Sequence, residues 1–218
     1  GDAAALMERA PLLQQTLAQV VACEAEDDGF NALIVSAGLE PQSVVLVRAL
    51  FRYLKQAGMP YALSTVVEAL RQQQHITRAL IHLFHACHDP AFEGDRTEAG
   101  KTADEAIVAS LAQVTSIDED RIIRLFQAVI HACLRTNFFL ESGTLALAFK
   151  LDSAKVPGLP KPLPWREIWV YSQRVEGIHL RSGPVARGGL RWSDRRDDFR
   201  TEILGLMKAQ RVKNAVIV

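Results

Sequence analysis

Cysteine is scarce in this chain, and its arrangement limits the class of protein. The 218 residues include three cysteines, Cys23, Cys87 and Cys133, which are widely spaced and form no CxxC pair. An odd and scattered set argues against a disulfide-stabilised secreted scaffold and favours a reducing compartment. We therefore predict a cytoplasmic protein.

Long apolar runs and targeting segments are also missing. No run approaches the roughly 18 apolar residues that a membrane-spanning helix needs. The acidic start, which contains glutamine, lacks the basic and apolar regions of a signal peptide. We predict no membrane partner.

Net charge is absent as well, because 25 lysines and arginines balance 25 aspartates and glutamates. The chain as a whole therefore has no electrostatic footprint for a nucleic-acid backbone, and we predict no nucleic-acid partner. The sequence contains no Walker phosphate loop, no GxSxG elbow and no GxGxxG fingerprint. Nucleotide binding is therefore not predicted for this stretch.

Helical spacing dominates the chain from about residue 40 to residue 140. Apolar residues recur there every three or four positions, which is typical of helices that bury one face. The polar run Glu93–Lys101 predicts a loop. Thr102 with Glu105, and Ser116 with Glu119, predict two helix starts because each pair fits a capping box. The apolar stripes consist of Val44, Val47, Leu50, Phe51 and Leu54; Val66, Val67 and Leu70; Ile76, Leu80, Leu83, Phe84 and Cys87; and Ile122, Leu125, Phe126, Val129, Ile130 and Cys133.

Strand spacing replaces helical spacing after the predicted end of the helices near Asn137. Apolar and other residues alternate from Leu145 to Leu151, which predicts a half-buried strand. A proline-rich connector follows, and then further strands and one helix. The predicted strands are 168–172, 177–180, 190–192 and 215–218, and the helix starts near 194–198 and ends near Asn214.

These patterns predict an α+β fold with two parts. Residues 1–140 form a mainly helical region, and residues 141–218 form the first strands and one helix of an α/β substrate-binding domain. The sequence stops in an apolar strand, so we expect a truncated domain and a fragment of a longer protein.

A cationic segment lies near the end of the otherwise neutral chain. Residues 181–213 contain nine lysines and arginines and four acidic residues. Such a segment predicts a local pocket for carboxylates or phosphates, because charge-assisted hydrogen bonds are strong. A solvated face with surface ion pairs is the alternative. The basic residues are Arg181, Arg187, Arg191, Arg195, Arg196, Arg200, Lys208, Arg211 and Lys213.

Two short patterns within this segment are candidate binding elements. Gly188 and Gly189 stand between Arg187 and Arg191, so a ligand can approach the main chain closely. Further on, Gln210 and Lys213 are three residues apart near a helix end, with Met207 one step earlier. A paired glycine is more often a turn or a bulge, which is the alternative here, and a favourable helix dipole is the alternative explanation of the lysine.

The histidines do not form a metal-binding pattern. His82, His85 and His88 are three residues apart, with Cys87 among them. On a helix such a series turns around the axis and does not converge, whereas a zinc site needs a converging set. His131 and Cys133 lie further on, and no metal is predicted.

A nearly unbroken match to one family lies in the last part of the chain. Its segments are Arg174–Arg181, Gly183–Arg195, Asp198–Gln210 and Val212–Val218, with a weaker likeness through Asn31–Pro90, Arg135–Asn137 and Phe149–Asp152. This sequence resembles the helical region and the start of the catalytic domain of large bacterial NAD-specific glutamate dehydrogenases. The first thirty residues fit least well.

The resemblance implies an enzyme that oxidatively deaminates L-glutamate to 2-oxoglutarate and ammonia with NAD. By family likeness, Arg187 with Gly188 and Gly189, Gln210 and Lys213 bind the substrate carboxylates. Arg191 and Met207 are possible supporting residues. The wider family has lysine where this chain has Arg187, whose planar fork has a different reach and geometry.

The resemblance also implies parts that this stretch does not contain. In the family a catalytic lysine follows the strand that corresponds to Ala215–Val218, and an aspartate and the NAD-binding domain come later. We therefore predict no catalytic and no cofactor-binding residue in this chain and no activity by itself. The rest of the same enzyme and further copies of it, in a homo-oligomer, are the expected partners.

Two other functions remain open from the sequence. The continuous amphipathic helices before residue 140 fit a noncatalytic assembly module, and the cationic segment fits an anion-binding module for phosphorylated ligands. Neither explains the order and spacing of the glycines, the glutamine and the lysine.

Overall fold

The computed structural model describes residues 7, 9–23, 25–140, 146–184, 190–191, 193–195, 197–210 and 214–217. Their order along the chain is helices first and a sheet with one further helix afterwards, which confirms the predicted α+β fold. The helices of the first part are α2 (Ala10–Val21), α3 (Leu33–Ser36), α4 (Pro41–Gln56), α5 (Leu63–Gln72), α6 (Gln74–His88), α7 (Arg96–Leu111) and α8 (Ile117–Ala132), with a 3-10 turn η1 (Gly29–Ala32) before α3.

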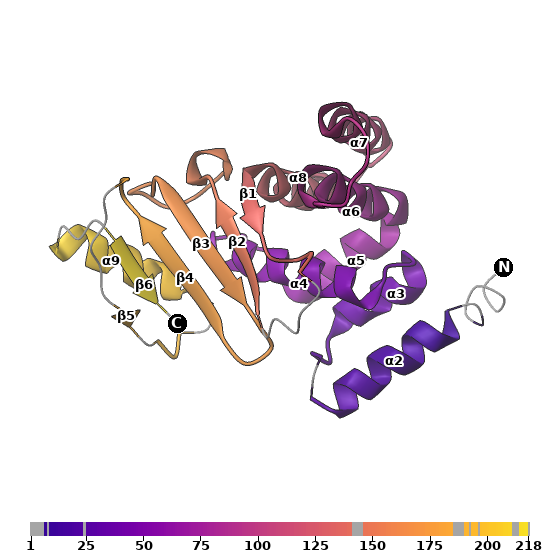
Figure 1. Cartoon of the computed structure of the whole chain (residues 1–218), viewed down its shortest axis with the longest axis horizontal. Coiled ribbons are helices and arrows are strands. Elements are labelled where there is room, and N and C mark those ends of the chain that lie inside the picture. Colours follow the sequence, from indigo (N-terminus) through magenta and orange to yellow (C-terminus); the bar gives the residue numbers. More distant parts are fainter. Residues whose placement is uncertain are drawn as a thin grey trace. The chain divides into compact units, whose positions relative to one another are not determined.

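The second part is built on one sheet of six strands (Figure 1). Its strand order is β1-β2-β3-β4-β6-β5. The pairs β1–β2, β2–β3, β3–β4 and β4–β6 are antiparallel, whereas β5 and β6 are parallel. The bounds are β1 (Cys133–Thr136), β2 (Leu147–Leu151), β3 (Arg166–Tyr171), β4 (Glu176–Arg181), β5 (Leu190–Arg191), α9 (Phe199–Gln210) and β6 (Asn214–Ile217), with a 3-10 turn η2 (Ser153–Lys155) after β2.

The chain divides into two compact units, and each unit consists of two separate stretches of the sequence. One unit consists of residues 1–48 and 61–124, and the other of residues 49–60 and 125–218. Helices α4 and α8 therefore contribute residues to both units. The second half of α4 belongs with the sheet, although it lies far from the sheet in sequence. A domain boundary between residues 140 and 141 stays a prediction.

The core of the first unit forms where the apolar stripes of its helices meet. Phe30, Ile34, Leu70 and Leu80 are almost fully buried there. Arg48 is buried with them, and its guanidinium donates to both carboxylate oxygens of the partly buried Asp28 at 2.7 Å. Within the described residues, no helix is long and apolar enough to cross a membrane.

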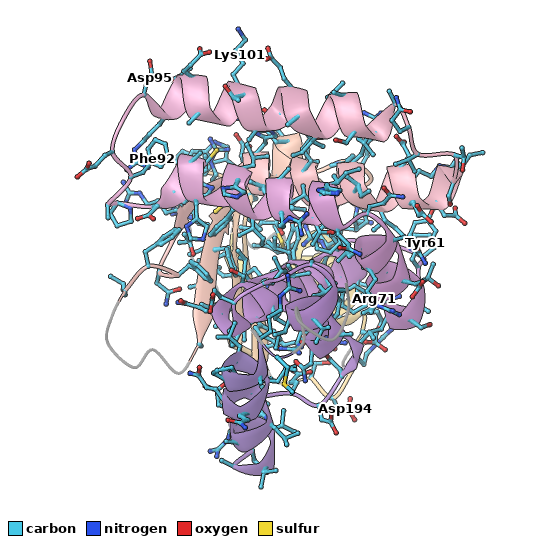
Figure 2. All side chains as sticks on the ribbon, turned by 90° about the vertical axis from the view of Figure 1, so that its right-hand side faces the viewer. Tyr61, Arg71, Phe92, Asp95, Lys101 and Asp194 are labelled. Atoms are coloured by element: carbon cyan, nitrogen blue, oxygen red, sulfur yellow. The ribbon has the colours of Figure 1, made fainter. Side chains whose placement is uncertain are left out.

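Helix α7 starts earlier than the sequence analysis predicted. Asp95 accepts hydrogen bonds from the amides of Thr97 and Glu98 at 2.8 and 3.2 Å, so it caps a helix that begins at Arg96. The predicted loop Glu93–Lys101 is therefore wrong beyond Asp95, and Thr102 lies inside the helix. Asp95 can take the place of Thr102 as the capping residue because Asp95 and Glu98 also have the spacing of a capping box. Figure 2 shows Asp95 at the start of α7, which runs beside α6.

The Asp95 cap gives a stability prediction. Asp95→Ala removes the acceptor for two otherwise orphaned amides, so the free energy of unfolding should fall by about 1 kcal/mol. Thermal unfolding of the chain, followed by circular dichroism, measures the change. Glu93→Ala removes a nearby exposed carboxylate that caps nothing, and it should leave the midpoint unchanged. Equal midpoints for the two variants would contradict the role of Asp95.

The other predicted helix start is confirmed at Ser116. Its Oγ accepts from the amide of Glu119 at 3.4 Å, at the start of α8. The side chain of Glu119 accepts instead from Gln73 at 2.7 Å. The predicted end of α8 is wrong: the helix stops at Ala132, and Cys133–Thr136 is strand β1. Pairing with β2, a contact that is distant in sequence, overrides the helical spacing that reaches Cys133.

Candidate substrate-carboxylate site

The last three elements form a parallel βαβ unit. Strand β5 runs parallel to β6, with Leu190 opposite Val216 and Arg191 opposite Ile217. Helix α9 connects them and packs on β6. The amino ends of both strands therefore lie at the same edge of the sheet, and the end of α9 leads back to that edge.

The predicted site residues fall mainly outside the described part of the chain. Arg187, Gly188, Gly189 and Lys213 are not described, so their meeting at one ligand stays a prediction. For Arg191 and Gln210 the structure gives the backbone position: Arg191 ends β5, and Gln210 is the last residue of α9. Met207 lies one turn earlier in α9 and is buried.

The start of α9 is held by a buried ion pair. The Nη1 atom of Arg200 donates to Oε2 of Glu167 at 2.5 Å, and both side chains have no exposed surface. Glu167 lies on β3, which has hydrogen-bonded neighbours on both sides, opposite Leu151 and Leu180. Arg200 therefore ties the first turn of α9 to the middle of the sheet.

Electrostatics in this interior favour a charged Arg200 beside a neutral tyrosine. Burial raises the pKa of Tyr53 well above its usual value, and the negative charge of Glu167 raises it further. Burial is the largest single influence on Arg200 and by itself lowers its pKa, but the interactions with Glu167 and Tyr53 together outweigh burial, so the pKa of Arg200 is raised. The guanidinium lies 5.9 Å from the centre of the Tyr53 ring, which adds a cation–π contact.

The second half of α4 provides further contacts for the same helix start. The side-chain oxygen of Gln56 accepts from the backbone amide of Arg200 at 3.1 Å in the interior. One of the orphan amides of the first turn of α9 is thereby satisfied by a residue that precedes it by more than a hundred positions. Gln56 thus acts as a long-range cap for α9.

Removing this cap should be visible at a single amide. Gln56→Ala leaves the buried amide of Arg200 without its acceptor, which costs about 1–3 kcal/mol. We expect the Arg200 amide to exchange its hydrogen at least about 10-fold faster than in the unmodified chain, as measured by NMR hydrogen exchange. The exposed Gln72→Ala should not change that rate. An unchanged Arg200 rate in Gln56→Ala would refute the cap.

An aromatic cluster joins the same three elements. The indole nitrogen of Trp169 on β3 donates to the carbonyl of Ala49 on α4 at 3.0 Å. The Trp169 ring stacks with Phe199 of α9 at 6.1 Å and meets Tyr53 edge-on at 6.0 Å. These contacts cover one face of the sheet with α4 and α9.

A second ion pair fixes α4 to the neighbouring strand. Arg52 donates to both carboxylate oxygens of Glu176 on β4, at 2.5 and 3.2 Å. It also reaches Asp197 before α9, at 3.4 Å. The second half of α4 is therefore an integral part of the sheet unit.

The predicted cationic segment is not one exposed patch. Arg200 is fully buried and paired with Glu167, so it offers no charge to a ligand at the surface. Arg195 forms an exposed ion pair with Asp198. Arg195 therefore fits the alternative of a solvated face with surface ion pairs, whereas Arg200 fits neither that alternative nor a pocket for a ligand.

Sequence reasoning missed the buried network. It assigned no role to Glu167, Tyr53 or Gln56, and it counted Arg200 only as surface charge. One signal was available: Glu167, Trp169 and Tyr171 alternate along β3 and share the buried face. The partners of Glu167 come from distant segments, which a local pattern does not reveal.

A hollow of about 580 Å³ between α6 and α7 is unsuited to a dicarboxylate. Alanines, Phe92 and His82 line much of it, and its charged lining residues are Asp95 and Glu98. Carboxylates there would repel an anionic ligand. In the described part of the chain, no three His, Cys, Asp or Glu residues are grouped so that they could hold a metal ion.

These elements define an α+β protein that ends in a parallel βαβ unit of the kind found in α/β enzymes. Residues 106–218, slightly more than half of the chain, match the family model of the bacterial NAD-glutamate dehydrogenase catalytic domain. Residues 25–90 match the model of glutamate dehydrogenase helical motif 3. The chain belongs to the family of bacterial NAD-glutamate dehydrogenases, which confirms the resemblance drawn from its sequence.

Individual relatives agree with the family models. The NAD-specific glutamate dehydrogenase of Mycobacterium tuberculosis is 51% identical over 199 residues, which are 88% of this chain and 12% of that protein. Those of Pseudomonas aeruginosa and Halomonas elongata are 45% and 46% identical over 95% and 96% of this chain. The chain spans only 12–13% of the length of these relatives.

Proposed function

We propose that this chain supplies the substrate-carboxylate site of an NAD-dependent glutamate dehydrogenase. The whole enzyme would oxidatively deaminate L-glutamate to 2-oxoglutarate and ammonia. Family membership supports the reaction, since three relatives with that name match nearly all of this chain. The observation that carries the site is the parallel pairing of β5 with β6.

Parallel pairing supports convergence of the two predicted segments. Arg187, Gly188 and Gly189 directly precede β5, and Lys213 directly precedes β6. Segments that lead into neighbouring parallel strands enter the sheet at the same edge. Gln210 ends the helix that returns to this edge. The segment before β5, the end of α9 and the segment before β6 are therefore expected to lie close together at this edge of the sheet.

Each residue type suits one part of a five-carbon dicarboxylate. Arg187 and Lys213 provide fixed positive charge and charge-assisted hydrogen bonds, and Gln210 provides an amide donor. Gly188 and Gly189 let the carboxylate approach backbone amides. Arg191 and Met207 would support this arrangement from β5 and α9.

The described strands do not form the parallel sheet that dinucleotide-binding domains use. The sequence has no GxGxxG fingerprint, and the described strands form one parallel pair only. We propose that NAD is bound by another domain of the enzyme and that a catalytic lysine lies outside this chain too. A cytoplasmic homo-oligomer remains our expectation for the whole enzyme.

The isolated chain gives a direct prediction. Residues 1–218 should show no turnover with glutamate and NAD, because NAD binding and the catalytic lysine are assigned elsewhere. The absorbance of NADH measures turnover, and the whole enzyme at the same molar concentration is the control. Sustained NADH formation by the isolated chain would contradict this assignment.

The substrate class is tested by calorimetric titration of the whole enzyme. We expect 2-oxoglutarate to bind and inorganic phosphate to leave that binding unchanged, because the site is matched to two carboxylates. Tighter binding of phosphate, with displacement of 2-oxoglutarate, would instead favour the alternative of a module for phosphorylated ligands.

A further inference from the structure

Burial of the Arg200–Glu167 pair carries a cost in free energy, so a gain in stability alone does not explain why the pair is buried. Both side chains have no exposed surface. Removing two charges from water carries a desolvation penalty that often cancels their attraction, so buried pairs are weak stabilisers overall. Their clearest benefit is a unique arrangement, because a charged hydrogen bond is directional and apolar packing is not.

The Arg200–Glu167 pair fixes the first turn of α9 on the sheet. Further along α9, up to Lys208, the buried residues are the apolar Ile203, Leu204 and Met207. Contacts of this kind allow small sliding and rotation. In contrast, Arg200 is held twice, by Glu167 at its guanidinium and by Gln56 at its amide. Together they set the position and rotation of the helix on the sheet.

The far end of α9 carries the predicted substrate residues. Ten residues separate Arg200 from Gln210, a distance of about 15 Å along a helix. A tilt of about 5° at the Arg200 end would shift the Gln210 end by roughly 1 Å over that length. A shift of about 1 Å at a reacting centre can cost about 100-fold in rate.

We propose that Arg200 and Glu167 are positioning residues for the substrate site: they hold α9 so that Gln210 and Lys213 meet the carboxylates of glutamate. This inference rests on the proposed function. Neither residue touches the substrate. Both act through the placement of the helix, with Gln56 and Tyr53 completing their surroundings.

The test is a double variant of the whole enzyme, Glu167→Leu with Arg200→Met. It removes both charges and leaves no unpaired charge in the interior, so the fold is expected to persist. We expect the KM for glutamate to rise about 10-fold or more and the KM for NAD to stay within about 2-fold. The matched control, Asp152→Leu with Arg166→Met, removes another ion pair that involves β3 but does not touch α9. It should leave both KM values unchanged.

Three results would overturn the proposal. One is a folded double variant with normal kcat and a normal KM for glutamate. The second is an equal rise of both KM values, which indicates general damage to the fold. If the double variant does not fold, Arg200→Lys decides: it keeps the charge but is shorter and has no donor at the position of Nη1, so its KM for glutamate should still rise. A normal value in this folded variant is the third contrary result.

The Lys213→Ala variant distinguishes a failure of the proposed substrate site from a failure of the positioning role alone. If Lys213→Ala raises the KM for glutamate and the double variant does not, the substrate site stands and the positioning role fails. If Lys213→Ala has no effect on glutamate, the proposed function fails, and the positioning inference fails with it.

Discussion

Replacing Lys213 with alanine should lower kcat/KM for glutamate by about 10- to 100-fold in the whole enzyme. The substitution removes a charge-assisted hydrogen bond to a substrate carboxylate, which is worth about 1.5–3 kcal/mol. Steady-state kinetics at saturating NAD measures the effect. The KM for NAD should not change, because NAD is assigned to another domain.

A control on helix α9, which precedes Lys213 in the sequence, isolates the role of position 213. Lys208 is an exposed residue of α9, five positions earlier. Lys208→Ala removes the same charge from the same region, so it reports any general electrostatic attraction of glutamate. We expect its kcat/KM to stay within about 2-fold of the unmodified enzyme. Equal losses in the two variants would mean that diffuse charge, and no specific contact, explains the effect.

Removing one partner of the buried pair should have the largest effect on stability. Arg200→Met leaves the carboxylate of Glu167 fully buried and uncompensated, so the free energy of unfolding should fall by about 3–5 kcal/mol. Urea denaturation of the 218-residue chain measures this, and a midpoint shift on the order of 1–2 M is expected. Charge pairing, and not the length of the side chain, is the physical reason.

The partly exposed pair Arg166–Asp152 is the matched control for this stability effect. Its two side chains are 25% and 15% exposed, so water can solvate the remaining charge after Arg166→Met. We expect a loss of about 1 kcal/mol or less. A loss in Arg200→Met no greater than that in Arg166→Met would show that the Glu167 carboxylate is not left buried.

Local patterns of the sequence predicted the elements that are determined by short-range spacing. The predicted alternation corresponds to β2 from Leu147 to Leu151, and Leu145 lies outside the described residues. The apolar stripes of α4, α5, α6 and α8 are buried except for the half-buried Cys87 and Leu125. Both results follow from the periods of strand and helix, which are fixed by backbone geometry. The family motif gave the candidate site residues by likeness alone.

Contacts between distant segments could not be predicted in the same way. Strand β1 exists because Cys133–Thr136 pairs with β2, although the residues before it are helical. Gln56 caps a helix that lies 144 positions away, and Glu167 pairs with an arginine 33 positions away. Local spacing does not encode these partners, since they depend on how the sheet and helices pack.

The two-unit division also affects how the assembly alternative can be tested. Residues 49–60 and 125–140 belong with the sheet unit, so a chain cut after residue 140 separates them from their contacts, including that of Trp169 with Ala49. Light scattering on residues 1–140 would then detect association through exposed core surface as well as specific assembly. A chain that retains residues up to 218 avoids this problem.

We propose that Arg187, Gln210 and Lys213 meet on one dicarboxylate at the edge of the sheet where β5 and β6 begin. A structure of the whole enzyme with bound 2-oxoglutarate tests it most directly. We predict that Arg187 and Lys213 each donate to a carboxylate of the ligand within hydrogen-bonding distance, with Gln210 beside them. A ligand bound elsewhere, with these three side chains directed at separate surfaces, would contradict the account.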